Sequence, residues 1–142
     1  MGKKERIRPI SICLMRRGEE ILVSEAYDSV KKRGFARPLG GGIDFGETSA
    51  QAAIREIKEE LGVDITGVEL LGIVENTFVY EGTPGHEIVF VYDGRFVDES
   101  LYGRESLTAV EGKQKFEVVW RSPQSLRDGP CYLVPQEIWQ FL

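Results

Sequence analysis

The stretch that most constrains this chain of 142 residues runs from Gly40 to Val63, where a glycine-rich turn leads directly into a helical pattern. Thr48 and Gln51 have the spacing of a capping box, in which each side chain bonds the other residue's backbone amide. Gly62 supplies the usual signal for the end of a helix. The sequence therefore predicts a helix from about Ser49 to Leu61.

The predicted helix has an apolar face and an acidic face. At roughly 100° per residue, the stripe expected to pack on the core consists of Ala50, Ile54, Ile57 and Leu61, with Ala53 on its flank. Glu56, Glu59 and Glu60 share one arc on the other side. Like charges three or four residues apart destabilise a helix by a few tenths of a kcal/mol per pair. Solvent, a cationic neighbour such as Arg55 or a bound metal ion is needed to offset that repulsion.

Three glutamates beside a flexible glycine turn suit a hard divalent cation. Mg²⁺ prefers oxygen ligands and commonly bridges carboxylates to substrate phosphates. A solvated acidic face is the alternative, because most runs of charge are exposed surface. The chemistry of these residues alone leaves both interpretations open.

The spacing of this stretch resembles the full signature of the Nudix hydrolases. Gly41 is followed after five residues by Glu47, and then after seven by Arg55-Glu56-Ile57, one residue, Glu59-Glu60, one residue and Gly62-Val63. Every specified position of this 23-residue segment, the Nudix box, is present, and the resemblance is loose elsewhere. It implies an α/β fold, a Nudix-type α/β/α sandwich with a mixed β-sheet, in a single domain over residues 1–142.

The resemblance also implies a Mg²⁺-dependent hydrolase, with Mn²⁺ as the alternative ion, acting on a nucleoside diphosphate linked to another group. Water attacks phosphorus in the pyrophosphate bridge, so no covalent nucleophile is required. The metal ligands implied are Gly40 through its carbonyl, Glu56, Glu59 and Glu60. Arg55 resembles the arginine that holds the acidic cluster in place, and Glu47 matches the supporting glutamate of the box. The chain departs from the family pattern at Leu39. The family commonly has proline directly before the glycine pair, whereas here Leu39 lies between Pro38 and Gly40.

The general base of the implied reaction is left open. Inside the box, the candidates are Glu56 and Glu59. Outside it, we favour Glu111 or Glu117 over Glu105, because acidic residues before a late strand often reach the metals in similar proteins.

Four residues outside the box are candidates for binding the substrate. Arg37 is a candidate for contacting phosphates, since cations stabilise charge that develops on a transferring phosphoryl group, and a solvated loop is the alternative. Phe35 is a candidate for stacking on a base or for anchoring its loop. Tyr80 lies near the position where dinucleoside polyphosphate hydrolases of the family carry a base-stacking tyrosine, and packing is its alternative. His86, the single histidine, is a candidate for positioning substrate, with a structural role as the alternative.

Composition limits the partners. A net charge of −5 argues against general binding of nucleic acid or anionic membranes, because both need a basic surface. No segment approaches the roughly 18 apolar residues of a membrane span. Cys13 and Cys131 are too few for a disulfide framework. We therefore expect a cytoplasmic protein. The resemblance to the Nudix hydrolases implies a small-molecule nucleotide substrate, of the nucleoside triphosphate or dinucleoside polyphosphate class, and homodimers are common among similar proteins.

Two other functions are considered. A Nudix-fold module that binds a nucleotide without hydrolysing it is the main alternative, although its box would be expected to be eroded. A structural protein with an acidic helix would show no effect of divalent ions on its thermal stability.

Local patterns predict the remaining elements. Strands are expected over residues 9–15, 21–27, 64–80 (as two strands or one bent at Gly72), 87–96 and 115–121. Short helices are expected after Ser122 and over residues 135–141. Loops that line a substrate cleft are expected over residues 28–37, 82–86 and 97–112.

Overall fold

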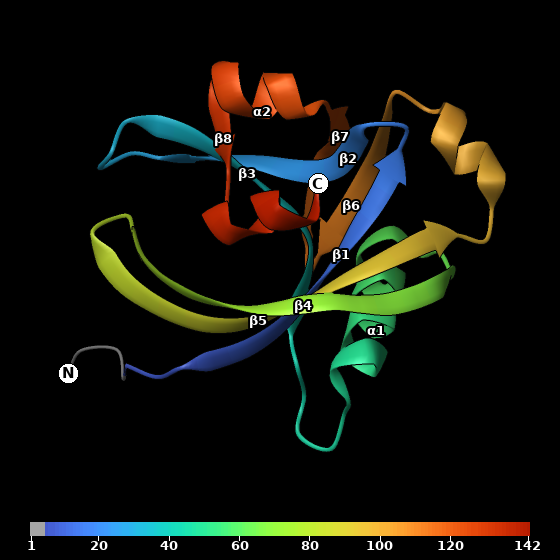
Figure 1. Cartoon of the computed structure of the whole chain (residues 1–142), viewed down its shortest axis with the longest axis horizontal. Helices are drawn as coiled ribbons and strands as arrows, with labels where there is room; N and C mark the ends of the chain where they lie inside the picture. Colours follow the sequence, from blue (N-terminus) through green and yellow to red (C-terminus); the bar gives the residue numbers. More distant parts are fainter. Residues whose placement is uncertain (1–4) are drawn as a thin grey trace.

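The computed structural model describes residues 5–142, which form a mixed β-sheet with helices on both faces (Figure 1). The elements in chain order are β1 (Arg8–Arg17), β2 (Glu20–Asp28), β3 (Arg33–Gly42), α1 (Ser49–Leu61), β4 (Ile65–Tyr80), β5 (Thr83–Phe96), η1 (Glu99–Gly103), β6 (Ser106–Glu111), β7 (Gln114–Arg121), α2 (Pro123–Asp128), β8 (Cys131–Leu133) and η2 (Gln136–Phe141).

Strand β3 joins the two halves of the sheet. The strand order is β4-β5-β1-β3-β2-β7-β6, and β8 pairs with β3. The pairs β1–β5 and β3–β8 are parallel, and the other pairs are antiparallel. Residues 33–38 of β3 pair with β2, whereas residues 39–42 pair with β1. The glycine turn therefore leaves the sheet from its centre.

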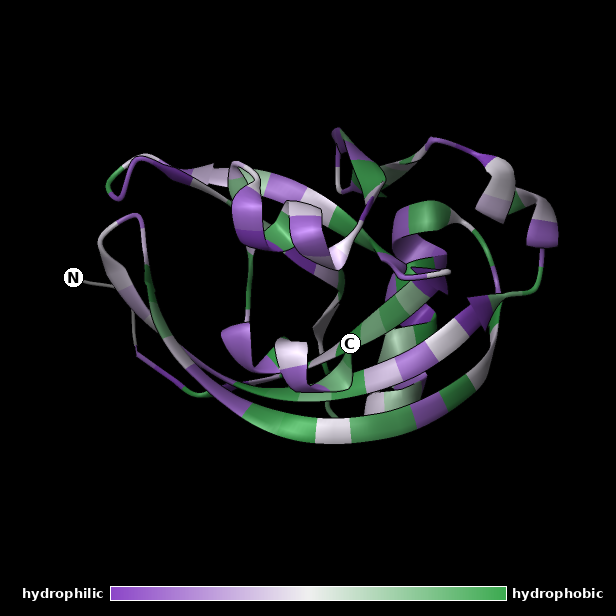
Figure 2. Ribbon diagram, turned by 45° about the horizontal axis from the view of Figure 1, so that its top comes forward, coloured by the Kyte–Doolittle hydropathy of each residue, from purple (hydrophilic) through white to green (hydrophobic). Residues whose placement is uncertain are grey.

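Alternate residues of β1 face two separate hydrophobic cores, which makes the fold layered. Cys13 and Met15 pack with Ile57 of α1. Ile12 on the opposite face packs in a second core with Leu126 of α2, and Ile138 of η2 belongs to the same core. Figure 2 shows hydrophobic residues recurring along the strands between these helical layers. The predicted α/β fold with a mixed sheet is confirmed.

Helix α1 begins and ends where the sequence predicts. The Gln51 amide donates to the Thr48 hydroxyl at 3.1 Å, and the Thr48 amide donates to the Gln51 side chain at 2.9 Å. Gly62 ends the helix in the left-handed conformation, with φ of 72°. The capping box and the glycine stop therefore set both ends.

The buried face of α1 differs from the predicted stripe. Ala52 and Glu60 are buried together with Ala53 and Ile57, whereas Ile54 is 41% exposed. The helix contacts β3 and β6 as well as β1, so its buried face is turned toward the side that carries Glu60.

Two segments predicted as loops belong to the sheet. Residues 33–37 form the first part of β3, where the backbone pairs with both β2 and β8. Residues 97–112 contain η1 and β6, and β6 buries Leu107 and Ala109. The predicted loop at residues 82–86 is also shorter, since β5 begins at Thr83. These predictions were wrong because the segments lack a clear strand pattern of their own. They gain strand structure by pairing, β6 with the adjacent β7 and β3 with both β2 and the distant β8.

The remaining elements agree more closely with the predictions. β4 is one strand with a register shift between Leu70 and Gly72, which corresponds to the predicted bend. Ser122 caps α2. The predicted last helix is a 3₁₀ helix, and β8 was not predicted.

Both cysteines are free thiols. Burial, followed by the nearby charge of Asp93, raises the pKa of Cys13 to about 12, so this thiol remains protonated. None of the helices formed by residues 5–142 has the length and apolar character needed to cross a bilayer.

Candidate functional site

Arg55 ties the glycine turn to the acidic face of α1. Its Nε and Nη2 donate to the two carboxylate oxygens of Glu47 at 2.7 and 2.9 Å, and Nη2 also donates to the Gly42 carbonyl at 2.9 Å. Its Nη1 donates to Glu56 at 2.9 Å and to Glu59 at 3.2 Å. One guanidinium therefore offsets the repulsion among neighbouring carboxylates. These contacts, with Glu47 first, raise the pKa of Arg55 further above its usual value.

The turn between β3 and α1 is held against Glu47. The Asp44 amide donates to the Glu47 carboxylate at 3.0 Å, and the Glu47 amide donates to the Asp44 carbonyl at 3.0 Å. Hydrogen bonds from Arg55, and then from the Asp44 amide, hold the pKa of Glu47 below its usual value. The turn projects from the sheet beside α1 (Figure 1). Glu47 is thus ionised and fixes the start of the helix.

Glu60 is the exceptional carboxylate of this region. Its side chain is buried, the residue being only 9% exposed, and its Oε1 has no hydrogen-bond partner among the described residues. Burial, followed by the charges of Glu56 and Glu111 and a hydrogen bond with Glu56, raises the pKa of Glu60 to about 8, and the charge of Arg37 opposes this shift. A buried acceptor without a partner typically costs about 1–3 kcal/mol. This oxygen therefore requires a proton or a cation.

Two glycines allow this close packing. A Cβ at Gly41 would lie 2.5–2.7 Å from the carboxylate atoms of Glu56. A Cβ at Gly40, which pairs with Ile12 in β1, would collide with the Ser11 carbonyl. The backbone at Gly40 and Gly41 therefore fills the space between β1 and the Glu56 side chain.

Residues from two strands join the glutamates of α1. Glu111 is the last residue of β6 and lies on the same face of that strand as Ala109. Ala109 packs in the same core as α1. Arg37 lies on β3, two residues before the core residue Leu39. Both are close enough for their charges to shift the pKa of Glu60. We call Glu56, Glu59, Glu60 and Glu111 the carboxylate cluster.

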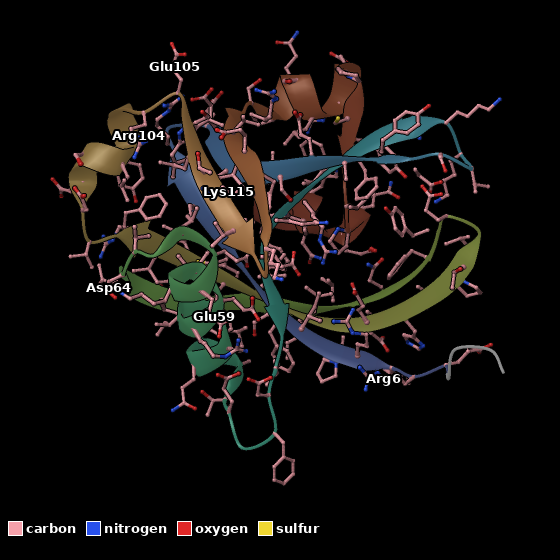
Figure 3. The ribbon with its side chains drawn as sticks, turned by 180° about the vertical axis from the view of Figure 1, so that it is seen from behind. Arg6, Glu59, Asp64, Arg104, Glu105 and Lys115 are labelled. Atoms are coloured by element: carbon pink, nitrogen blue, oxygen red, sulfur yellow. The ribbon has the colours of Figure 1, made fainter. Side chains whose placement is uncertain are left out.

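The other two candidate bases lie elsewhere. Glu117 accepts a hydrogen bond from Thr108 at 2.8 Å, and both side chains are exposed. Its neighbours Phe116 and Val118 pack on the α1 side, so Glu117 points to the opposite face of the sheet. Figure 3 shows Glu105 at the far end of β6 from α1.

The candidate substrate-binding residues are only partly brought together. The rings of Phe35 and Tyr80 meet edge to face, with centroids 5.5 Å apart and planes at 81°. Arg37 lies two residues from Phe35 on β3. His86 instead lines an open pocket of about 570 Å³ between the β4–β5 hairpin and residues 5–7, and no residue of α1 lines this pocket.

A family model described as the NUDIX domain matches residues 5–136. The chain belongs to the Nudix family. The resemblance seen in the Nudix box is thereby confirmed over almost the whole chain.

Known relatives agree with this assignment. NAD-capped RNA hydrolase NudC of Pseudomonas aeruginosa is 34% identical over 67 residues, or 47% of this chain and 23% of the relative. RNA pyrophosphohydrolase of Wolbachia sp. subsp. Brugia malayi is 30% identical over 96 residues, or 66% of this chain and 55% of the relative. The crystal structure of a MutT Nudix hydrolase from Burkholderia pseudomallei is 25% identical, with a TM-score of 0.65 and 92% of each chain covered. The chain thus spans about a quarter to about half of these two curated relatives.

The Nudix-family carboxylates fit a divalent cation by their chemistry. All the donors are hard oxygen atoms, which Mg²⁺ prefers, and the buried Oε1 of Glu60 lacks a partner. Among residues 5–142, no three His, Cys, Asp or Glu side chains are arranged to hold a metal ion. Glu56 and Glu59 instead accept hydrogen bonds from Arg55, so an ion bound by them would compete with that guanidinium.

Sequence reasoning did not anticipate the burial of Glu60 or the contact between Gly41 and Glu56. The only sequence signal for either was the box itself, since helical periodicity assigned Glu60 to the polar side. Because side chains alternate between the two faces of a strand, Glu111 and Glu117 can be assigned to opposite faces of the sheet once the register of β6 against β7 is known. The sequence alone does not supply that register.

Proposed function

We propose that this Nudix-family chain hydrolyses a pyrophosphate bond in a nucleoside diphosphate linked to another group. The substrate class that we infer is a nucleoside triphosphate or a dinucleoside polyphosphate. The observation that carries this proposal is the unpartnered, buried oxygen of Glu60 beside Glu56 and Glu111. Such an arrangement is costly unless it serves to hold a cation or a proton.

The proposed ion is Mg²⁺, with Mn²⁺ as the alternative, held by Glu56, Glu59 and Glu60 with the carbonyl of Gly40. A bound ion of this kind neutralises charge on phosphate oxygens and lowers the pKa of a bound water. Arg55 and Glu47 orient the ligands, as their hydrogen bonds support. A water oxygen forms the new bond to phosphorus, and the bridging P–O bond breaks.

Glu111 is our choice for the general base. It would take the proton from the attacking water, and its position beside Glu60 supports this role. Arg37, whose charge acts on Glu60, would contact the phosphates. Phe35 and Tyr80 would receive the base. His86, which lines a separate pocket, has no assigned part in this proposal.

The names of the curated relatives concern RNA, so RNA ends belong in the test. The net charge of −5 favours a small nucleotide over an extended nucleic acid, because polynucleotide binding relies on basic surfaces. We therefore propose the small nucleotide as substrate and treat RNA 5′ ends as the competing class.

The experiment is product analysis after incubation with nucleoside triphosphates, nucleotide sugars, dinucleoside polyphosphates and capped RNA. We expect Mg²⁺-dependent cleavage of a phosphoanhydride bond in at least one nucleotide of the first or third group. Tight binding of a nucleotide without turnover of any substrate would overturn hydrolysis and identify a Nudix-fold binding module instead.

We also propose that the protein works in a reducing compartment such as the cytoplasm, which its two unpaired thiols support. A homodimer is the proposed assembly, and sedimentation equilibrium would test it directly.

A further inference from the structure

The turns of two hairpins contact each other at one edge of the molecule. Ser29, in the β2–β3 turn, donates from its amide to Glu81 Oε1 at 2.7 Å and from its hydroxyl to Glu81 Oε2. Glu81, in the β4–β5 turn, donates from its own amide to Asp28 Oδ2 at 3.2 Å. Figure 1 shows both turns on the same side of the fold. We call Asp28, Ser29 and Glu81 the hairpin clasp.

Asp28 organises both turns at once. Its residue is only 2% exposed, and its Oδ1 accepts the amides of Val30 and Lys31, each at 3.0 Å. The carboxylate thus shapes its own turn with one oxygen and holds Glu81 with the other. Glu81 has φ of 51°, which side chains other than glycine adopt rarely. Gly82, with φ of 77°, follows it, and positive φ at both central residues is typical of the type I′ turn that joins two strands through two residues.

The hairpin clasp lies directly beside the aromatic pair. Tyr80 precedes Glu81, and its ring meets the edge of Phe35 at 5.5 Å. In the strand order, β1 and β5 lie between β3 and β4, so strand pairing does not bring these two rings together. The contact between the hairpin turns accounts for their proximity.

The aromatic pair and the carboxylate cluster are linked along β3. Phe35 and Arg37 are two residues apart and share one face of the strand, which separates them by roughly 7 Å. Arg37 acts on Glu60, whose pKa it lowers. A nucleotide whose phosphates lie between Arg37 and Glu60 would therefore extend its base toward Phe35 and Tyr80.

We propose that the hairpin clasp positions the nucleobase end of the substrate by holding Tyr80 against Phe35. Asp28, Ser29 and Glu81 are positioning residues in this account, since they act through the aromatic pair. The inference rests on the proposed function and deepens it, because it assigns base recognition to the two hairpins and phosphate chemistry to α1.

The test uses Ser29→Ala, with Ser100→Ala as a matched control. Ser100 also donates its hydroxyl to a carboxylate on an exposed turn, that of Asp98, but in η1. For a nucleotide that the wild type hydrolyses, Ser29→Ala should raise KM about 3- to 10-fold, in line with the loss of one hydrogen bond. The kcat value should stay within about twofold, and Ser100→Ala should change neither constant.

Two further variants separate positioning from general stability. Glu81→Gln keeps an acceptor for Ser29 and should have a KM closer to wild type than Glu81→Ala. The double variant Ser29→Ala/Glu81→Ala should be no worse than Glu81→Ala alone, because both changes remove the same contact. A lowered Tm with unchanged KM, or a lowered kcat with unchanged KM, would overturn the inference.

The two proposals fail in different ways. If the wild type hydrolyses nucleotides but the clasp variants keep its KM, the positioning role is wrong and the hydrolytic function stands. If the wild type hydrolyses no nucleotide, the proposed function is wrong and the inference falls with it.

Discussion

The Nudix box and the hairpin clasp are built from contacts of very different range. Arg55 reaches Glu47 eight residues away and Gly42 thirteen residues away. Ser29 and Glu81 are separated by 52 residues. The proposed reaction centre is therefore encoded locally, and the proposed base-recognition end depends on how two distant hairpins fold together. On this account, changes near the carboxylates should lower turnover, whereas changes near the hairpin clasp should weaken binding.

The largest effect is expected at Glu111. Glu111→Gln should lower kcat by about 10²- to 10⁴-fold, the usual contribution of a general base. Glu117→Gln is the matched control, since Glu117 bonds Thr108 on the other face of the sheet, and it should stay within about twofold of wild type. Steady-state kinetics on the best nucleotide checks both. Equal losses in the two variants, or none in either, would remove Glu111 from the mechanism.

Arg55→Lys should produce the next largest effect. Lysine cannot reproduce the fork that bonds Glu47, Glu56 and Gly42 together, so kcat should fall by about 10- to 100-fold, as for partners of metal ligands. Lys58→Arg, an opposite exchange on an exposed part of α1, is the control. The same kinetic assay decides, and full activity with lysine at position 55 would show that the carboxylates need no such clamp.

A smaller effect, and one of a different kind, is expected at Tyr80. Tyr80→Ala should raise KM about tenfold, since stacking on a base contributes about 1–3 kcal/mol, and kcat should change less than about threefold. Tyr80→Phe should remain close to wild type. Tyr27→Ala, at an exposed tyrosine of β2, controls for general surface effects. A fall in kcat at constant KM would abolish the distinction between the two regions.

The smallest effect concerns the stability of the metal-free protein. Burial first, and then the charges of Glu56 and Glu111, raise the pKa of Glu60 from 4.5 to about 8, so protonation of Glu60 favours the folded state. This stabilisation is complete below pH 4.5 and is lost as the pH rises through 8. The Tm should fall by roughly 3–10 °C between pH 5 and pH 8, and Mg²⁺ should restore it at pH 8.

Thermal unfolding of Glu60→Gln provides the comparison for this pH effect. Glutamine cannot titrate, so the variant should show a flatter dependence of Tm over the same range. The pKa of Glu47 is lowered by Arg55. Glu47 therefore contributes stability that is lost only as the pH falls below the pKa that this carboxyl has in the unfolded chain, and it does not change the Tm between pH 5 and pH 8. A wild-type Tm that is constant from pH 5 to pH 8 would contradict the burial of a titrating Glu60.

Much of the box could be predicted because its determinants are close in sequence. The capping box at Thr48 and the stop at Gly62 defined α1 to the residue. Periodicity failed at Ile54 and Glu60, because the direction of the buried face depends on β3 and β6, which pack beside the helix.

The parts that could not be predicted depend on tertiary pairing. The sequence of residues 33–37 is typical of a basic loop. In the structure these residues form a strand, because their backbone pairs with β2 and β8. Glu111 and Glu117 are equally acidic in sequence, and only the register of β6 against β7 puts them on opposite faces. The contact between Ser29 and Glu81 has no local signal at all.

The central claim is that the carboxylates of α1 support ion-dependent hydrolysis, and Glu60→Gln tests it most directly. Nucleotide hydrolysis by wild type and variant should be measured across a Mg²⁺ titration, with Tm recorded to confirm folding. The account predicts activity that depends on Mg²⁺ in the wild type and a loss on the order of 10²-fold or more in the variant, because the ion supplies several kcal/mol of charge stabilisation. A folded Glu60→Gln protein with wild-type activity and the same Mg²⁺ dependence would contradict it.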